Sequence, residues 1–389
     1  MTKTQRFLRL VAGIATVVAL GALAGESLLA PALAAPRPAP LPEGPARGEP
    51  PLGGGTLRAP LLGDDGLFRA VLIGDGGSRP ADPSARALVS AVAAACAAGP
   101  TCDAAVLLGD NFYGLGALGL AAPEGPMMRR RFHQRYAPLA LPFYAVLGNH
   151  EYLSPAPLAS VRHTFRHREV AIAGDILVVT PKGPTWVQPW RYWALRDGDD
   201  LELIFLDTLA LVGAVPGPLE ALHDRQLVWL RDHCAATTAP RRRIAFGHHP
   251  AATFGKYRDS PDDLLSTEVV EALLACGVRD YASGHDHHLQ RIDLRTTRPD
   301  GTIDAFHQVV SGKGGAVRKA YPFADVEARA HPPTKPWDGL SWVATLASDH
   351  TGDRVGNQYA GWTDLRVTRG PDGAVDVTTT LEGVDPPAR

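Results

Sequence analysis

Five segments of the chain end in side chains that commonly bind metal ions. Each is an apolar run of strand length followed by a polar turn: FRAVLIGDGG (68–77), AAVLLGDNFYG (104–114), PFYAVLGNHE (142–151), RRIAFGHHP (242–250) and YASGHDHH (281–288). One aspartate after a strand is usually a turn residue, but five such turns together have the composition of a metal site. Their polar side chains are those of Asp75, Asp110, Asn111, Tyr113, Asn149, His150, His248, His249, His285, Asp286 and His287.

These residue types and spacings suit two metal ions. Asp110 is the natural bridge, because the two oxygens of a carboxylate can hold cations about 3.5 to 4 Å apart, as in two-metal hydrolases. Asp75, Asn149 and three imidazoles would complete the two coordination shells. His285 and His287 are two residues apart, so they could face neighbouring ions instead of competing for one. A zinc finger is excluded, because the sequence has no CxxC pair.

The alternation of strand-like and helix-like segments along the chain predicts an α/β fold that would bring these turns together. Helix-like stretches at 84–98 and 126–136 separate the first three strands, and a strand at 201–208 and helices at 219–234 and 266–276 continue the pattern. In such folds the loops that follow strands are held rigidly and stay accessible, so ligands converge there. Alternating segments near the end of the chain, TDLRVT and AVDVTTTLEG, predict a second, more antiparallel sheet that closes a sandwich.

The composition indicates a globular chain without a polyanionic partner. The 389 residues carry a formal net charge of -2, with 45% hydrophobic and 21% charged residues. Neither nucleic-acid binding nor wholesale disorder is therefore expected.

The first residues are typical of an exported protein. Lys3, Arg6 and Arg9 precede an uncharged apolar run at 10–25, and the tripeptide at 32–34 is a small-x-small cleavage pattern. We expect 1–34 to be a signal peptide, 35–60 a Pro/Gly-rich linker and 61–389 the catalytic domain, secreted or kept in the periplasm or cell envelope. The alternative is a retained anchor, although the apolar run is shorter than the roughly 20 residues that span a bilayer. The mature chain has no other segment that could span one.

The four cysteines are consistent with an oxidising compartment and allow three pairings. A local bridge between Cys96 and Cys102 is plausible, because Gly99 and Pro100 would turn the chain between them. The alternative is that all four are buried thiols.

In order and spacing, the five turns resemble the GD, GDN, GNHE, GHHP and GHDH blocks of the calcineurin-like metallophosphoesterase superfamily. Within it the likeness is strongest to purple acid phosphatases of the small tartrate-resistant type. GDNFY places Tyr113 three residues after Asp110, and Gly77 stands where the broader phosphodiesterase families have a histidine. The likeness runs over about 68–312. It implies a four-layer α/β sandwich of two mixed β-sheets flanked by helices, with β-α-β-α-β halves.

The resemblance also implies a binuclear centre of Fe(III) and a divalent ion, which would be iron, zinc or manganese. A hard phenolate favours a trivalent cation, so Tyr113 points to Fe(III). The implied Fe(III) ligands are Asp75, Asp110, Tyr113 and His287. The implied ligands of the divalent ion are Asp110, Asn149, His248 and His285.

A protein of this kind is expected to be an acid phosphatase-like hydrolase of small phosphate monoesters, which a metal-bound hydroxide attacks without a covalent enzyme intermediate. Asn149 and His150 would contact the substrate. His150 would protonate the leaving alcohol, or else only orient a metal ligand. The family's further substrate-contacting histidine would fall near Tyr257, so either His249 takes that role or nothing does.

Some neighbours of these residues are assigned less specific roles. Asp286 is expected to cap its turn rather than touch substrate. The family's cysteine after LDT is absent, so a bridge between Cys234 and Cys276 would be this chain's own.

Two rival functions remain at this point. One is a phosphodiesterase or nucleotidase with a divalent binuclear centre on the same fold, for which Arg129, Arg130 and Arg131 are candidates for the rim of a groove; otherwise they form a solvated helix face. The other is an inert exported binding protein, which would lack metal ligands. The natural ester and the oligomeric state stay open.

Overall fold

The computed structural model describes residues 54–77, 82–113, 129–152, 177–178, 184–212, 217–236, 238–258, 260–315, 334–337, 340–349 and 360–384. The expected signal peptide and most of the expected linker lie outside the described residues. Among the described residues, no helix combines the length and apolar character needed to cross a membrane.

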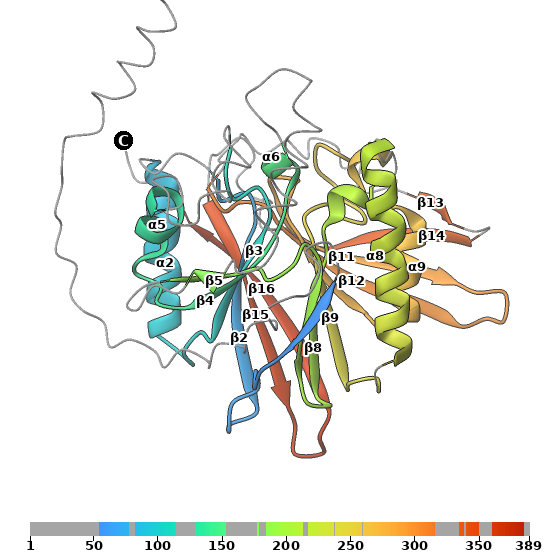
Figure 1. Ribbon diagram of the computed structural model, residues 1–389, viewed down its shortest axis with the longest axis horizontal. Coiled ribbons are helices and arrows are strands. Elements are labelled where there is room, and N and C mark those ends of the chain that lie inside the picture. The colour runs from blue at the N-terminus through green and yellow to red at the C-terminus, as the bar shows by residue number, and fades with distance from the viewer. Residues whose placement is uncertain are drawn as a thin grey trace, which may run out of the picture. The chain divides into compact units, whose positions relative to one another are not determined.

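The described strands form two sheets that pack face to face, with helices on their outer sides (Figure 1). The seven-stranded sheet has the order β16-β15-β2-β3-β4-β6-β5, and the nine-stranded sheet has the order β1-β7-β8-β9-β10-β12-β11-β14-β13. The first consists of β2 (Leu67–Ile73), β3 (Ala104–Leu108), β4 (Pro142–Val146), β5 (Leu177–Val178), β6 (Thr185–Val187), β15 (Ala360–Arg369) and β16 (Val375–Val384). The second consists of β1 (Gly55–Arg58), β7 (Trp193–Asp197), β8 (Leu201–Phe205), β9 (Arg242–Phe246), β10 (Asp280–Ser283), β11 (Leu289–Thr297), β12 (Ile303–Ser311), β13 (Thr334–Trp337) and β14 (Leu340–Asp349).

The expected helices at 84–98, 219–234 and 266–276 are present within a few residues of their predicted ends. Asp82 caps the first of them by accepting a hydrogen bond from the backbone N–H of Ser84, and Pro83 occupies its first turn, where a missing N–H costs nothing. The described α-helices are α2 (Pro83–Ala97), α5 (Gln134–Tyr136), α6 (Asn149–Tyr152), α8 (Gly217–Ala236) and α9 (Thr267–Ala275), with 3₁₀ turns at Thr208–Ala210 and Pro261–Asp263 and a π-helix at Arg129–His133.

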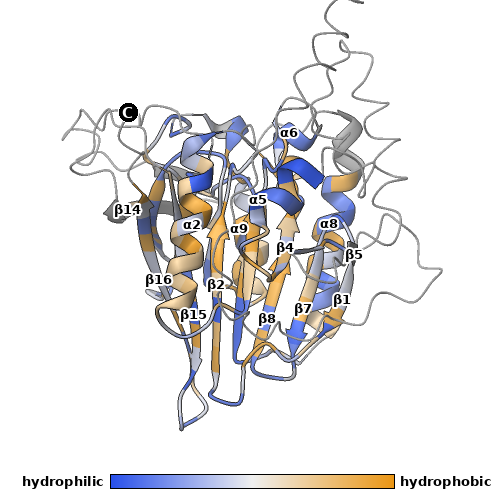
Figure 2. Cartoon of the chain, turned by 90° about the vertical axis from the view of Figure 1, so that its left-hand side faces the viewer, coloured by the Kyte–Doolittle hydropathy of each residue, from blue (hydrophilic) through white to orange (hydrophobic). Residues whose placement is uncertain are grey.

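Three apolar cores separate the four layers. Leu88 and Val92 of α2 belong to the core outside the seven-stranded sheet. Leu203 and Phe205 belong to the core between the sheets, and the third core joins α8 and α9 to the nine-stranded sheet. Figure 2 shows hydrophobic residues concentrated in the central strands, such as β2, β4 and β7. The expected architecture of two mixed sheets flanked by helices is confirmed.

Parallel pairing places the five polar turns at one edge of the sandwich. Strands β2, β3 and β4 are parallel neighbours in one sheet, and β8, β9 and β10 are parallel neighbours in the other. The carboxyl ends of parallel strands meet at the same sheet edge. The turns after β2, β3, β4, β9 and β10 therefore face one another.

The C-terminal strands correct one expectation. β15 and β16 do not belong to a second sheet, because β15 pairs antiparallel with β2 and extends the first sheet. Alternation along β15 puts Leu365 and Val367 into the core between the sheets. Sequence alternation identifies a strand and its buried face, but it does not identify the strand with which it pairs.

The expected boundary between linker and domain at residue 61 is also corrected. β1 lies inside the expected linker and pairs parallel with β7. Leu57 and Ala59 are buried in the core between the sheets, and Asp197 accepts hydrogen bonds from the backbone N–H groups of Leu61 and Leu62. The folded body therefore begins before residue 61.

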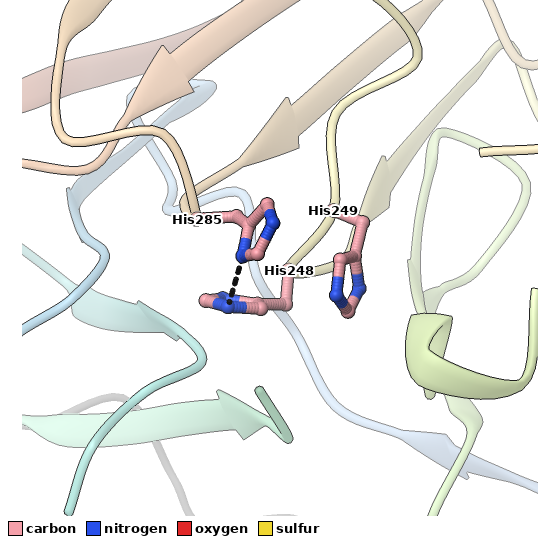
Figure 3. A group of neighbouring side chains, drawn as sticks. All are labelled: His248, His249 and His285. Carbon is pink, nitrogen blue, oxygen red and sulfur yellow. Dashed lines mark hydrogen bonds between the residues drawn. The ribbon is translucent and has the colours of Figure 1, made fainter. Parts of the chain in front are cut away.

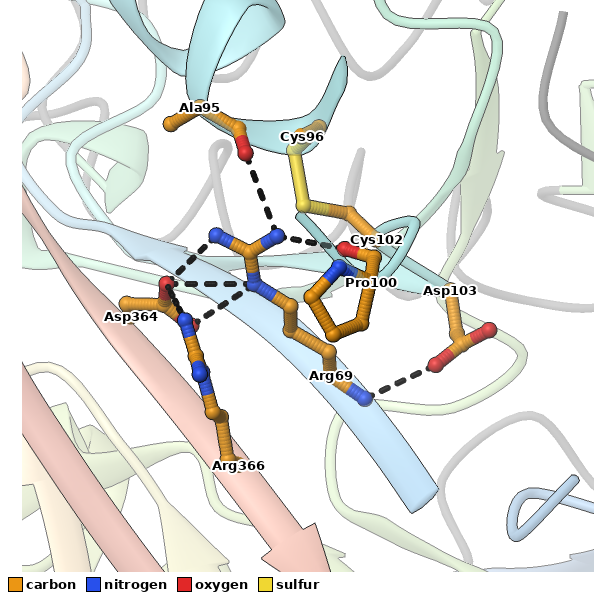
Figure 4. The surroundings of a disulfide bond; sticks show 8 residues. All are labelled: Arg69, Ala95, Cys96, Pro100, Cys102, Asp103, Asp364 and Arg366. Carbon is orange, nitrogen blue, oxygen red and sulfur yellow. Dashed lines mark hydrogen bonds and ion pairs between the residues drawn. A yellow bond between two sulfur atoms is a disulfide. The ribbon is translucent and has the colours of Figure 1, made fainter. Parts of the chain in front are cut away.

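All four cysteines are paired, so the alternative of four buried thiols is wrong. Disulfides join Cys96 to Cys102 and Cys234 to Cys276. Beside the first, the buried guanidinium of Arg69 donates to the Asp364 carboxylate and to the carbonyl oxygens of Ala95 and Pro100 (Figure 4). The end of α2 and the disulfide loop are thereby fixed to β2 and β15.

Candidate metal centre

The seven expected metal ligands converge from five loops. The turns after β2 and β3 carry Asp75, Asp110 and Tyr113, and Asn149 begins α6 after β4. The turns after β9 and β10, in the other sheet, carry the three histidines, His248, His285 and His287. Asn111 is not part of this cluster, because its amide group donates to the carbonyl oxygen of Val146.

Three side chains expected to hold Fe(III) lie within hydrogen-bonding distance of one another. The phenol oxygen of Tyr113 lies 2.9 Å from Oδ1 of Asp75 and 3.2 Å from Nε2 of His287. The same Nε2 is 3.2 Å from Asp75 Oδ1. The other oxygen of Asp75 accepts a hydrogen bond from the backbone N–H of His285 at 2.8 Å, which links the two sheets.

The side chains expected to hold the divalent ion gather around Nε2 of His248. This atom lies 3.1 Å from Oδ1 of Asn149, 3.4 Å from Oδ1 of Asp110 and 3.3 Å from Nδ1 of His285 (Figure 3). Nδ1 of His248 lies 2.8 Å from the carbonyl oxygen of Leu108. A carbonyl only accepts, so Nδ1 carries the proton and the lone pair of Nε2 faces the cluster.

The two buried carboxylates differ strongly in proton affinity. Burial alone would raise the pKa of Asp75, but the charge and hydrogen bond of His287, with the charges of His248 and His285, lower it to about 2. Burial and then the charge of Asp75 raise the pKa of Asp110 to about 7. Like charges in a dry site resist joint ionisation. A cation between them would remove that conflict.

The donor set therefore fits metal binding. Ligand atoms of Asp75, Asp110 and His248 lie within 4.8 Å of one another, and so do ring nitrogens of His248, His249 and His285. Carboxylate and imidazole groups of this kind hold iron, zinc and manganese in proteins. The assignment of each residue as a ligand stays a prediction.

The backbone at this edge is held in uncommon conformations. Asp75, Asp110 and His285 have φ values of 60°, 52° and 66°, in a region that residues other than glycine rarely adopt. Gly148 packs against Asp110 so closely that a Cβ there would lie 2.3 Å from Asp110 Oδ1. These turns aim their side chains at a common centre at the expense of backbone strain.

A family model described as calcineurin-like phosphoesterase matches residues 68–289. The chain belongs to this family. Tartrate-resistant acid phosphatase type 5 of Oryctolagus cuniculus is 25% identical over 195 residues, covering 47% of this chain and 54% of that protein. Purple acid phosphatase 3 of Arabidopsis thaliana is 25% identical over 240 residues, covering 58% of this chain and 56% of that protein. The chain thus spans about half the length of these curated relatives.

A solved structure, GAP50, the anchor in the inner membrane complex of Plasmodium, matches with a TM-score of 0.45 and 15% identity over 82% of this chain and 90% of that one. The resemblance inferred from the five turns, to the superfamily and to its purple acid phosphatases, is confirmed at low identity.

Glu151 is a residue of this phosphoesterase that sequence analysis did not single out. Its buried carboxylate accepts hydrogen bonds from the backbone N–H groups of Asp110, Phe112 and Gly148, at 3.0, 2.9 and 2.6 Å. It therefore joins the loop that carries Asp110 and Tyr113 to the loop that carries Asn149. Its place in GNHE was the only signal, and backbone contacts made far along the chain leave no sequence pattern.

His249 is buried beside His248 and His285 and is held by Thr208. The Thr208 hydroxyl oxygen accepts from the backbone N–H groups of His248 and His249, each at 3.0 Å, and lies 2.9 Å from Nδ1 of His249. Its two lone pairs are thereby used, so its own hydrogen points to Nδ1, and Nε2 carries the imidazole proton. Burial, then the charges of His285 and His248, lower the pKa of His249 well below its ordinary value. The ring is a neutral hydrogen-bond donor.

His150 is partly accessible, since its side chain is 27% exposed. Its backbone N–H donates to Oδ1 of Asp110 at 2.8 Å. Its ring contacts the ring of Tyr113 edge-on, with centroids 4.4 Å apart. The imidazole can therefore reach a molecule that approaches the carboxylates from outside.

Tyr257 stacks on His285, with ring centroids 4.2 Å apart and planes inclined by 17°. The Lys256 ammonium donates to its hydroxyl at 3.1 Å. Asp286 fixes this loop by accepting from the Thr253 hydroxyl at 2.7 Å and from the Lys256 N–H at 3.3 Å. Asp286 was expected to cap its own turn, but its carboxylate binds this neighbouring loop, because the two loops follow β9 and β10, which are parallel neighbours in the nine-stranded sheet.

Proposed function

We propose that this calcineurin-like phosphoesterase is an exported phosphomonoesterase with a binuclear centre of Fe(III) and a divalent ion. The single observation that carries the proposal is the position of Tyr113. Its phenol oxygen lies against Asp75 and His287. A phenolate in this position favours a trivalent cation such as Fe(III), whereas an imidazole there would suit a softer divalent ion. The names of the relatives, which include purple and tartrate-resistant acid phosphatases, agree with this reading.

The residues would divide between two cations as the resemblance implies. Asp75, Tyr113 and His287 would hold Fe(III), while Asn149, His248 and His285 would hold the divalent ion, with Asp110 between them. When bound, such cations lower the pKa of a coordinated water and offset the negative charge of the phosphoryl group. The protein supplies the positions and the dry surroundings.

His150 is proposed to serve as the general acid. In hydrolysis of a monoester the bond between phosphorus and the ester oxygen breaks, and the departing alkoxide needs a proton. The partly exposed imidazole beside Asp110 can give that proton. His249 has its N–H donor fixed by Thr208, and it is proposed to hydrogen-bond to oxygens of the bound phosphate or of its water.

The three arginines at 129–131 give little support to the rival phosphodiesterase hypothesis, in which they would form the rim of a groove. Arg131 donates inward to the backbone of Gly77 and Tyr113, so it does not line an open rim. Arg129 and Arg130 are exposed. The inert binding protein is disfavoured because all the expected ligand types are gathered in one cluster.

Export is supported by the two disulfides and by the signal-like residues 1–34. Disulfides of this kind persist in oxidising compartments. We therefore propose that the protein works outside the cytoplasm, either secreted or held in the cell envelope.

The visible absorption spectrum of the unreduced protein tests the proposal. Phenolate bound to Fe(III) gives a charge-transfer band that is lost in Tyr113→Phe. A colourless wild-type protein with two divalent ions and full activity would reject the iron assignment and keep the phosphoesterase. Rates on a phenyl phosphate monoester and on the matching diester, measured side by side, distinguish the two ester classes.

Substitution of the divalent ligands gives a second test. Asn149→Ala or His285→Ala should lose the divalent ion and most turnover. Unchanged activity in both would reject the ligand assignment.

A further inference from the structure

A guanidinium group lies behind the two loops that carry Asp75 and Tyr113. Nη1 of Arg131 donates to the carbonyl oxygen of Tyr113 at 2.6 Å and to that of Gly77 at 3.2 Å. One of these carbonyls belongs to an expected ligand, and the other lies two residues after Asp75. A single nitrogen therefore binds the backbone of both loops.

The same two loops already approach each other closely. The backbone N–H of Gly77 donates to the carbonyl oxygen of Asp110 at 2.8 Å. The backbone N–H of Tyr113 donates to the carbonyl oxygen of Gly77 at 3.2 Å. A Cβ on Gly77 would lie 2.6 Å from the carbonyl oxygen of Asp110 and 2.7 Å from the nitrogen of Tyr113. No side chain fits there without displacing backbone. Arg131 thus adds hydrogen bonds to two loops that already pack closely against each other. A small shift of either backbone would move the phenol of Tyr113.

Arg131 is itself held in a fixed place. It belongs to the π-helix Arg129–His133, a rare form that often occurs at functional sites. The next residue, Phe132, is buried and contacts Phe143 and Trp186 edge-on, each with centroids 5.1 Å apart. Because Phe132 fills the core, its neighbour cannot move freely.

The same segment covers the Asp75 loop at a second point. A Cβ on Gly76 would lie 2.8 Å from the hydroxyl oxygen of Tyr136. The segment that contains Arg131 and Tyr136 therefore packs on the residues directly after Asp75 from two positions.

We propose that Arg131 is a positioning residue for the metal centre, which sets the place of the Tyr113 phenol through the backbone of Tyr113 and Gly77. The proposal rests on the proposed function in one respect, that Tyr113 binds a cation. Arg131 touches neither substrate nor cation in this account. Among the contacts of the described residues, it is the third of the consecutive arginines that binds the backbone beside the site.

The test compares Arg131→Ala with Arg130→Ala, whose arginine is the exposed neighbour on the same helix. Chelator-stripped full-length protein is titrated with Fe(III) citrate, and the visible band and the apparent affinity are recorded. Loss of a group that orients a ligand typically weakens metal affinity about 10-fold to 100-fold. We expect that loss and a shifted band in Arg131→Ala, with neither change in Arg130→Ala. The KM of the fully loaded enzyme should not change.

A second readout does not depend on the metal. Hydrogen exchange of the peptide containing Phe112 and Tyr113, measured in metal-free protein, should be faster in Arg131→Ala than in wild type. Arg131→Lys keeps a donor but not the rigid fork of the guanidinium, and we expect intermediate values of both affinity and exchange. If the alanine variant does not fold, the lysine variant carries the same comparison.

The outcomes separate this proposal from the proposed function. If Tyr113→Phe loses Fe(III) affinity while Arg131→Ala and Arg131→Lys keep wild-type affinity, band and exchange, the positioning role is rejected and the centre stands. If Tyr113→Phe binds Fe(III) as wild type does, Tyr113 is not a ligand, and the centre and the positioning role are both rejected.

Discussion

The phenol oxygen of Tyr113 donates a hydrogen bond to Oδ1 of Asp75 over 2.9 Å. Burial, followed by the charges of Asp75 and Asp110, raises the pKa of Tyr113 well above its ordinary value. Without a cation the phenol therefore keeps its proton at neutral pH. A cation can gain this ligand only by displacing that proton.

Metal loading should consequently release a proton from Tyr113. We expect Fe(III) binding to wild type to release about one proton more than binding to Tyr113→Phe. Calorimetric titrations in two buffers of different ionisation enthalpy measure that difference. Equal release in the two proteins would mean that the phenol stays protonated and unbound.

In metal-free protein, Asp110 should contribute stability that is lost as the pH rises from about 4 to about 7. The pKa of Asp110 is raised to about 7 in the folded state, whereas an unfolded aspartate titrates near 3.9. Between these values folded Asp110 keeps a proton that the unfolded residue loses, so its contribution to the free energy of unfolding falls with increasing pH. Urea unfolding of chelator-stripped wild type at pH 5 and pH 8 measures the effect.

Asp110→Asn is the control for that pH dependence, because it removes the titrating group and keeps the shape of the side chain. Between pH 5 and pH 8 its metal-free stability should fall less, or rise more, than that of wild type. Metal loading should also flatten the wild-type dependence, since a cation holds the carboxylate ionised at both pH values. Identical slopes in the metal-free proteins would contradict the raised pKa.

Glu151→Ala should destabilise the fold and inactivate the site together. It removes the acceptor of three backbone N–H groups, and each buried donor left unsatisfied costs about 1 to 3 kcal/mol. We expect the free energy of unfolding to fall by at least about 3 kcal/mol. Glu151→Gln keeps one oxygen and should fall between wild type and the alanine variant.

Glu268→Gln is the matched control for Glu151. It removes a carboxylate that pairs with Arg231 on the surface, and exposed pairs of this kind contribute about 0 to 1 kcal/mol. A fall of similar size in Glu151→Ala and Glu268→Gln would contradict the anchoring role of Glu151.

His150→Ala should spare metal binding and should slow mainly the hydrolysis of phosphate esters with poor leaving groups. The hydrogen bond to Asp110 comes from the backbone N–H of residue 150, and alanine keeps it. We expect the rate on alkyl phosphates, which have poor leaving groups, to fall about 10²-fold to 10⁴-fold. The rate on a nitrophenyl phosphate should fall much less, because its leaving group needs no proton.

The exposed His307, which pairs with Asp293, provides the control substitution His307→Ala. It should leave the rates on both ester types unchanged. A loss in His150→Ala that is equal for both ester types would argue against proton donation and for a role in binding.

The turns that carry the candidate metal ligands could be predicted because their signal is local. An apolar strand followed by a polar turn occurs at Asp75, Asp110, Asn149, His248 and His285, and parallel strands present their turns at one edge. The helices α2, α8 and α9 were predictable for the same reason. Apolar spacing within a dozen residues decides both kinds of element.

Contacts between distant segments could not be predicted. The pairing of β15 with β2 and of β1 with β7 depends on which sheet edge is free. The stacking of Tyr257 on His285 joins residues on different loops. The backbone hydrogen bonds of Glu151 and Arg131 are invisible as well, because every residue offers the same N–H and C=O groups whatever its side chain.

In the proposed metal centre, the left-handed turns at Asp75, Asp110 and His285 would link the abundance of this protein to its metal supply. A backbone conformation of this kind costs about 1 to 3 kcal/mol per residue, and selection for stability alone would favour glycine at such positions. The proposed ligand role explains why side chains stand there, because glycine has no ligand atom. Binding of a cation returns free energy to the folded state. A cell short of the metal would therefore hold a less stable protein, exposed to proteolysis before its activity was ever needed.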